Sequence, residues 1–158
     1  MNIFYLSKDP TTAALFQCDK HVVKMILETA QMLCTAHHIN GTDLDVDDLY
    51  KVAHRNHPST IWARTSEKNY DWLYKHFIAL CNEYFHRYKK IHATDRKFRC
   101  LLSQKPKYFP QTAFSHPPQC MPDTYKSSST VEAYRNYYYY DKRRFAKYTN
   151  RNCPVFMV

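Results

Sequence analysis

The chain has 158 residues, which is the length of one domain, and 44% of them are hydrophobic, enough for a packed core. It contains a single glycine, Gly41, which excludes the P-loop and the dinucleotide-binding fingerprint, because both need glycines at two or more fixed positions. The net charge of +9 is unevenly spread: residues 1–60 hold five basic and seven acidic side chains, whereas residues 61–158 hold eighteen basic and seven acidic ones. A basic, aromatic half is typical of proteins that bind phosphates and flat bases, so we expect DNA or a nucleotide as the partner.

The first part of the chain predicts two long helices. The opening NIFYL is a short apolar lead-in, and Asp9-Pro10 then begins a helical pattern over 11–38 with a break near 17–19. Residues 39–58 carry turn and acidic residues and predict a loop with one helical turn. Apolar and aromatic residues then recur at three-to-four spacing, which predicts one long helix over 59–90.

The second part predicts less regular structure. A shorter helix is expected over 94–103, and residues 104–128 hold five of the eight prolines, which indicates a long irregular loop. A capping box at Ser129 and Glu132 begins a final helix over 130–149. The predicted fold is therefore mainly α: a single compact helical domain over 1–158, with three principal helices and a proline-rich loop closing one side.

The sequence predicts an intracellular protein without a membrane span. The start MNIFYLSKDP lacks the apolar run of a signal peptide, and no apolar stretch reaches 18 residues. The six cysteines are expected to be reduced, with Cys34 and Cys81 in the core.

No cofactor is expected, and we predict no bound metal. Three pairs could each supply two ligands, namely Cys18 with His21, His54 with His57, and His116 with Cys120. None of them has the repeated spacing that is typical of a zinc site.

A line of polar residues runs along the most apolar predicted helix. Apolar residues cover more than half of residues 19–38, which predicts a central helix. His21, Lys24, Glu28 and Gln31 nevertheless follow one another at three-to-four spacing. If this line faces a cavity, then Glu28, Lys24 and His21 are candidate catalytic residues for proton transfer or charge stabilisation, and Gln31 is a candidate substrate contact. The alternative is an exposed surface line with an ordinary Lys–Glu ion pair.

A second group of candidates lies at the start of the predicted helix over 59–90. Because a helix N-terminus favours anions, Arg55 is a candidate phosphate contact and His57 a candidate substrate contact, unless His57 only caps the helix. Trp62 and Asn69 share a face, where they could stack on and read a base, and Arg64 is a further candidate substrate contact. The alternative is an ordinary core tryptophan.

The third group lies in the basic C-terminal half. Prolines fix the shape of the loop over 104–128, so the polar groups between them are candidate substrate contacts: His116, Gln119, Asp123 and Lys126. The helix that follows is basic and aromatic, and its candidate phosphate contacts are Arg135, Lys142 and Arg143. A solvated charged face is the alternative.

Several motifs together resemble a known family. They are the start MNIFYLSKDP, the segment CDKHVVKMILETAQML, and the segment NHPSTIWARTSEKNYDWLYKHFIALCNEYFHRY. Over about residues 1–90 the chain resembles the pyrimidine-dimer DNA glycosylase or endonuclease V-like proteins of phages and bacteria.

The resemblance implies a compact helical enzyme that flips a nucleotide out of DNA. In the well-understood members the N-terminal amine attacks the sugar and a glutamate on an early helix assists, which here corresponds to Glu28. Those members expose the amine by removing the initiator methionine, whereas here Met1 precedes Asn2, whose bulk should block removal. The amine of Met1, the amine of Lys24, or a purely hydrolytic reaction are therefore all left open.

Three functions are consistent with these observations. The first is a DNA-base-acting N-glycosylase, with or without lyase activity, that acts in DNA repair. The second is a viral protein that binds nucleic acid without catalysis. The third is a small-molecule enzyme that acts on free nucleotides or nucleotide signals.

Overall fold

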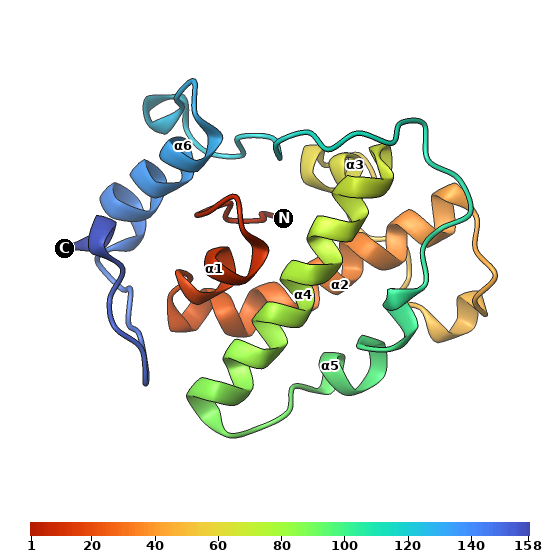
Figure 1. Ribbon diagram of the computed structural model, residues 1–158, viewed down its shortest axis with the longest axis horizontal. Helices are drawn as coiled ribbons and strands as arrows, with labels where there is room; N and C mark the ends of the chain where they lie inside the picture. Colours follow the sequence, from red (N-terminus) through yellow and green to blue (C-terminus); the bar gives the residue numbers. More distant parts are fainter.

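A computed structural model describes residues 1–158 as an assembly of helices without a β-strand, which confirms the mainly α prediction (Figure 1). The helices are α1 (Pro10–Leu15), α2 (Asp19–Asn40), α3 (Pro58–Thr65), α4 (Glu67–Tyr88), α5 (Ala93–Phe98) and α6 (Thr130–Tyr137). Short 3₁₀ turns occupy Val46–Asp48, Leu101–Ser103, Asp123–Tyr125 and Val155–Met157, and a π-helical segment follows α6 over Tyr138–Lys142.

The long helices α2 and α4 cross at the centre of the molecule (Figure 1). They supply most of one continuous core of 30 buried hydrophobic residues, to which α1, α3 and α5 also contribute. Cys34 and Cys81 both lie in this core, as predicted, and all six cysteines are free. No helix has the length and apolar content that crossing a membrane would require.

The first predicted helix is divided where the sequence indicated. Helix α1 ends at Leu15 and α2 begins at Asp19. The carboxylate of Asp9 caps α1 by accepting a hydrogen bond from the backbone N–H of Thr12 at 2.7 Å, and Pro10 occupies the first turn.

The prediction of one helix over 59–90 is wrong, because α3 and α4 are separate helices that meet at Ser66. This residue is extended, with φ −136° and ψ 142°, and its hydroxyl donates to the carbonyls of Thr112 at 3.0 Å and Ala113 at 2.6 Å. The helical periodicity of the sequence continues through the break without proline or glycine. The interruption is therefore made by contact with residues far along the chain.

The last predicted helix is shorter than expected. Helix α6 begins at the predicted cap, where Ser129 Oγ accepts from Glu132 N at 3.3 Å, but it ends at Tyr137 and not near residue 149. The π-helical segment that follows holds Tyr138, which is fully buried and whose hydroxyl lies 2.6 Å from His21 Nδ1. Tertiary contacts, rather than the local pattern, thus determine this part of the backbone. The helix expected over 94–103 is likewise shorter and consists of α5 and the 3₁₀ turn after it.

Residues 104–128, which we call the strap, run along one side of the molecule past the start of α4 and across α3 (Figure 1). Buried side chains fix their path. Asn69 accepts from Ser115 N at 3.0 Å and donates to Ser115 Oγ and to the carbonyl of Trp62, both at 3.1 Å. The indole of Trp62 donates to the carbonyl of Ser115 at 2.9 Å. The strap is therefore an ordered part of the fold.

The first prediction concerns the hydrogen bonds by which Asn69 holds the strap. Replacing Asn69 by alanine removes the three hydrogen bonds of a fully buried amide, one of them to the buried carbonyl of Trp62, so the free energy of unfolding should fall by about 1–3 kcal/mol. Urea unfolding measures the loss. The matched control is Asn56→Ala, an exposed asparagine, which should change stability by less than about 0.5 kcal/mol. Equal stabilities of the two variants would contradict the assignment.

A second prediction follows from three buried histidines. Burial lowers the pKa of His21, His37 and His76 to about 4 each. Because the unfolded chain binds these protons near pH 6.5 and the folded chain does not, stability is complete above pH 6.5 and falls as the pH drops toward 4. Urea unfolding at fixed ionic strength should show a loss of at least about 1 kcal/mol between pH 7 and pH 5, where carboxylates contribute little. A flat profile over that range would refute it.

Candidate functional site

Two of the candidate catalytic residues lie together on the rim of α2. Lys24 Nζ is 3.6 Å from Glu28 Oε1, and the side chains are 64% and 17% exposed, respectively. The polar line of α2 therefore meets solvent at Lys24 and partly at Glu28, without an enclosed cavity between them. Gln31, one turn beyond Glu28, is half-buried.

The third candidate, His21, is buried and engaged by aromatic rings. Its imidazole stacks on Phe4, with ring centroids 4.2 Å apart and planes inclined by 9°, and its Nδ1 contacts the hydroxyl of Tyr138. Desolvation, followed by the positive charges of Lys142, Lys24 and Lys20, lowers the pKa of His21 to about 4. The imidazole is therefore neutral at pH 7 and part of the packing beside Lys24.

The side chain of Asn2 ties the N-terminal segment to the strap. Asn2 Oδ1 accepts from the backbone N–H groups of Ile3 at 2.8 Å and Phe4 at 3.2 Å, and Asn2 Nδ2 donates to the carbonyl of Cys120 at 2.9 Å. Phe4 adopts a φ of 54°, in the left-handed region that non-glycine residues rarely occupy. The hydrogen bonds of Asn2 thus fix the backbone at Ile3 and Phe4 and attach this segment to Cys120 of the strap.

His57 lies at the start of α3. It is the N-cap of α3, and its Nδ1 accepts from Ser59 N at 3.1 Å, so the neutral ring carries its hydrogen on Nε2. Desolvation lowers the pKa of His57, the positive charges of the Met1 amine and His54 lower it further, and the Glu28 carboxylate opposes them. The charges of Glu28 and of the Met1 amine therefore both reach His57, and Lys24 pairs with Glu28, so we call Met1, Lys24, Glu28 and His57 the Glu28 cluster.

The strap candidates differ in their surroundings. His116 is exposed, and its Nδ1 lies 3.2 Å from the hydroxyl of Tyr5 in the N-terminal segment. Gln119 joins two parts of the strap, because its side chain makes two hydrogen bonds with the backbone of Ser127, at 2.7 and 3.1 Å. Asp123 and Lys126 form an ion pair of 2.8 Å at the surface. Of these four residues, only His116 contacts the N-terminal segment.

The candidates on α3 and α4 face the strap. Trp62 is 6% exposed and packs against Trp72 and Phe114. Asn69 is fully buried, and its amide makes the hydrogen bonds to Trp62 and Ser115 described above. Arg64 Nη1 donates to the carbonyl of Arg55 at 2.9 Å. These contacts place Trp62 and Asn69 in the packing of the strap, where neither ring nor amide is open to a ligand in this conformation.

The four candidate phosphate contacts fall into two pairs. Arg135 donates to the carbonyl of Leu6 at 3.0 Å and lies over the ring of Phe156, and Lys142 pairs with Asp141 at 2.6 Å. Arg55 and Arg143 are exposed and have no carboxylate partner.

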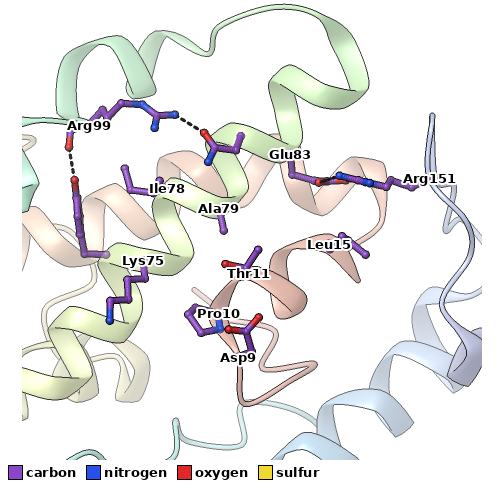
Figure 2. Close-up of a pocket in the computed structure, with 12 residues that line it drawn as sticks. Asp9, Pro10, Thr11, Leu15, Lys75, Ile78, Ala79, Glu83, Arg99 and Arg151 are labelled. Atoms are coloured by element: carbon purple, nitrogen blue, oxygen red, sulfur yellow. Dashed lines mark hydrogen bonds and ion pairs between the residues drawn. The ribbon is translucent and has the colours of Figure 1, made fainter.

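The largest hollow of the surface lies elsewhere, between α1 and α4. It has a volume of about 680 Å³, and Figure 2 shows Asp9, Pro10 and Leu15 on one side and Lys75, Ile78 and Glu83 on the other. Its cation Arg151 is already paired, because it binds Glu83 through both carboxylate oxygens at 2.8 and 3.0 Å. No pattern in the sequence indicated this hollow, and Glu28 does not line it.

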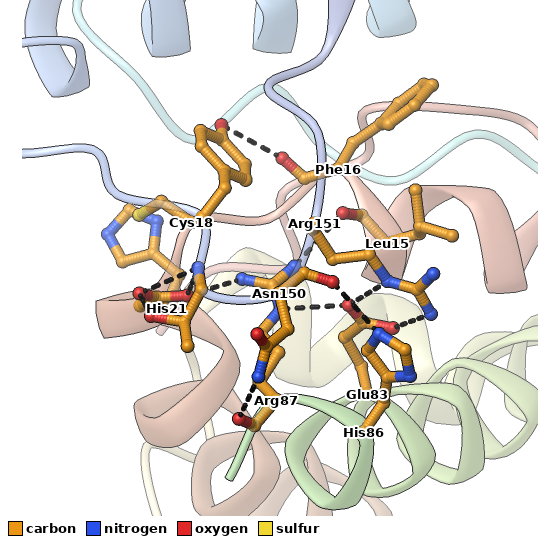
Figure 3. Close-up of polar contacts among 12 residues, drawn as sticks. Leu15, Phe16, Cys18, His21, Glu83, His86, Arg87, Asn150 and Arg151 are labelled. Atoms are coloured by element: carbon orange, nitrogen blue, oxygen red, sulfur yellow. Dashed lines mark hydrogen bonds and ion pairs between the residues drawn. The ribbon is translucent and has the colours of Figure 1, made fainter.

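A buried ionic network adjoins the hollow and ties the C-terminal region to the core (Figure 3). The guanidinium of Arg87 donates to Asp19 Oδ1 at 2.9 Å and to Glu83 Oε1 at 2.8 Å. Asp19 also accepts from the backbone and hydroxyl of Thr149 at 2.6–3.1 Å. No three side chains of the types His, Cys, Asp and Glu come close enough to bind one metal ion.

Comparison with known proteins gives one match. The family model described as pyrimidine dimer DNA glycosylase matches residues 1–96. The search of curated proteins and the search of solved structures each gave no match. The matched segment contains α1 to α4 and all four residues of the Glu28 cluster, and the strap and α6 lie outside it. The chain therefore belongs to the pyrimidine dimer DNA glycosylase family.

Proposed function

We propose that this protein is a DNA N-glycosylase that cleaves the base–sugar bond of a nucleotide flipped out of DNA, with Glu28 beside the reacting sugar. Membership of the family supports a DNA glycosylase-type function in general. The observation that carries the specific proposal is that the charges of Glu28 and of the Met1 amine both act on His57 at the start of α3, with Lys24 Nζ 3.6 Å from Glu28. DNA is the substrate, and DNA repair the setting, that this proposal implies.

Glu28 has the position and charge to stabilise the reacting sugar. When the bond from C1′ to the base breaks, its electron pair leaves with the base and positive charge develops on the sugar. A carboxylate fixed nearby lowers the energy of that state, most strongly where water is partly excluded. The Glu28 side chain is only 17% exposed, so its charge is partly shielded from water. Negative charge develops on the base at the other end of the breaking bond. The Nε2–H of His57 is available to donate a hydrogen bond to that base.

An amine within the cluster would extend the reaction to strand cleavage. Its nitrogen bonds to C1′ as the bond to the base breaks, and the departing base keeps the electron pair and takes up a proton. The nitrogen then gives a proton to the ring oxygen as the bond between C1′ and that oxygen breaks, which leaves an iminium ion. Removal of a proton from C2′ forms a double bond between C2′ and C3′ and expels the 3′ phosphate with the electron pair of the C3′–O bond. The Met1 amine is favoured over that of Lys24, because the Lys24 ammonium is paired with the Glu28 carboxylate at 3.6 Å.

The third prediction tests Glu28. Single-turnover cleavage of a duplex oligonucleotide with one pyrimidine dimer should slow at least about 100-fold in Glu28→Gln, because the neutral amide cannot stabilise the cationic sugar. The affinity for the same duplex should change by less than about threefold. The control is Glu67→Gln on α4, which makes the same change of charge at a partly exposed ion pair with Lys105.

The same experiment separates the proposal from its alternatives. Unchanged turnover in Glu28→Gln would refute the role of this carboxylate. Wild-type protein that binds the duplex without cleaving it would indicate a non-enzymatic DNA-binding protein. Wild-type protein that ignores the duplex and cleaves free nucleotides would indicate the small-molecule enzyme.

The fourth prediction concerns the amine. Borohydride added during reaction with abasic DNA should reduce an iminium and leave the DNA covalently attached to the protein. Digestion and mass spectrometry should place the adduct on the peptide that begins at Met1, and extra residues added before Met1 should abolish trapping. An adduct on Lys24 would reassign the nucleophile, and the absence of any adduct would mean that the glycosylase is hydrolytic.

A further inference from the structure

The region outside the matched segment carries almost all of the net positive charge. Residues 1–96 contain twelve basic and eleven acidic side chains, whereas residues 97–158 contain eleven basic and only three acidic ones. The site residues proposed for catalysis all lie in the first, nearly neutral part. The basic second part therefore needs an explanation beyond the reaction itself.

A row of aromatic rings leads from α2 into this basic region. His21 stacks on Phe4, the Phe4 ring lies 6.4 Å from Tyr137 at 29°, and Tyr137 lies 5.5 Å from Tyr125 at 29°. Tyr125 in turn lies 6.3 Å from Tyr140, and these two planes are inclined by only 8°. The row begins in the core and ends at Tyr140, which is 70% exposed.

The outer end of the row is firmly held. Tyr134 and Tyr138, on the buried side of the same helical segment, are both fully buried. The hydroxyl of Tyr134 donates to the carbonyl of Pro118 at 2.6 Å, and Tyr138 contacts His21. Because this side is fixed, the exposed ring of Tyr140 and the partly exposed ring of Tyr125 are positioned in advance and lose little freedom when a ligand binds.

Unpaired cations accompany the exposed rings. Arg143 lies over the ring of Tyr139 and donates to its hydroxyl, and Arg144 donates to the carbonyl of Asp141. Neither guanidinium has a carboxylate within 4 Å. Flat rings beside free cations are the combination that binds single-stranded nucleic acid, since bases stack on the rings and phosphates pair with the cations.

We propose that Tyr125 and Tyr140 form a platform on which unpaired bases of a single DNA strand stack, while Arg143 and Arg144 hold its phosphates. The inner end of the aromatic row, His21, is two turns of α2 from Glu28, a rise of about 10 Å. The row of rings thus links the platform to the helix that carries Glu28. A fully paired duplex hides its base faces, so the exposed rings favour an unpaired strand. This inference rests on the proposed function for the identity of the strand as DNA.

Fluorescence anisotropy with two labelled probes tests the platform. One probe is an oligo-dT strand, and the other has the same phosphates but tetrahydrofuran groups in place of its bases. Tyr140→Ala should bind oligo-dT about tenfold more weakly, the order expected for one lost base–ring stack, and should bind the second probe as the wild type does. Tyr140→Phe keeps the ring and should keep the affinity.

The control is Tyr108→Ala, because Tyr108 is a 65% exposed tyrosine on the strap and should not affect either probe. Unchanged binding of oligo-dT by Tyr140→Ala would overturn the proposal, and so would an equal loss on both probes or on paired duplex. The assay needs no turnover and is repeated on Glu28→Gln. Failure of the platform is therefore distinguishable from failure of the proposed function.

Discussion

The fold depends on how four buried residues near the N-terminus satisfy their backbone groups. Ile3–Leu6 are at most 5% exposed, yet they lie in no helix and pair with no strand. Buried amide and carbonyl groups without a partner are costly, so side chains from elsewhere must supply the hydrogen bonds. Asn2 accepts from two amides of this segment, Gln17 donates to the carbonyl of Ile3, and Arg135 donates to the carbonyl of Leu6.

This arrangement makes the C-terminal region part of the site. Arg135 belongs to α6, and Cys120, which accepts from Asn2, belongs to the strap. Both lie outside the segment that the family model matches. The residues proposed for catalysis are thus supplied by the first half of the chain, and the placement of the N-terminal segment beside them depends on the second half.

Local signals in the sequence predicted the features that local forces determine. The helical period located α2 and the long face of α4, Asp9 and Ser129 marked helix caps, and His57 does cap α3, one of the two interpretations of that residue. These features follow from spacing and from hydrogen bonds between neighbours in sequence.

Long-range contacts account for what the sequence could not predict. The break at Ser66 is held by carbonyls 46 and 47 residues away, and nothing in the local pattern indicates it. Spacing also placed His21 and Lys24 on one line of α2. It could not show that His21 is buried and Lys24 exposed, because the rings that cover His21 belong to Phe4 and Tyr138, which are distant in sequence or separated by a loop. Arg135 is expected from the sequence to bind phosphate because it lies in a basic segment. The sequence could not show that its guanidinium donates a hydrogen bond to the backbone carbonyl of Leu6.

The openness of the Glu28 cluster bears on the kind of substrate that it suits. A free nucleotide is usually bound in a concave pocket that covers most of its surface. The largest hollow of this protein lies between α1 and α4, and at its C-terminal end the guanidinium of Arg151 is already neutralised by Glu83. Glu28 instead lies on a helix rim with Lys24 exposed beside it. On such a rim a long polymer, held by cations over a wide area, can present a single nucleotide to the carboxylate, so the geometry favours DNA over a free nucleotide as the substrate.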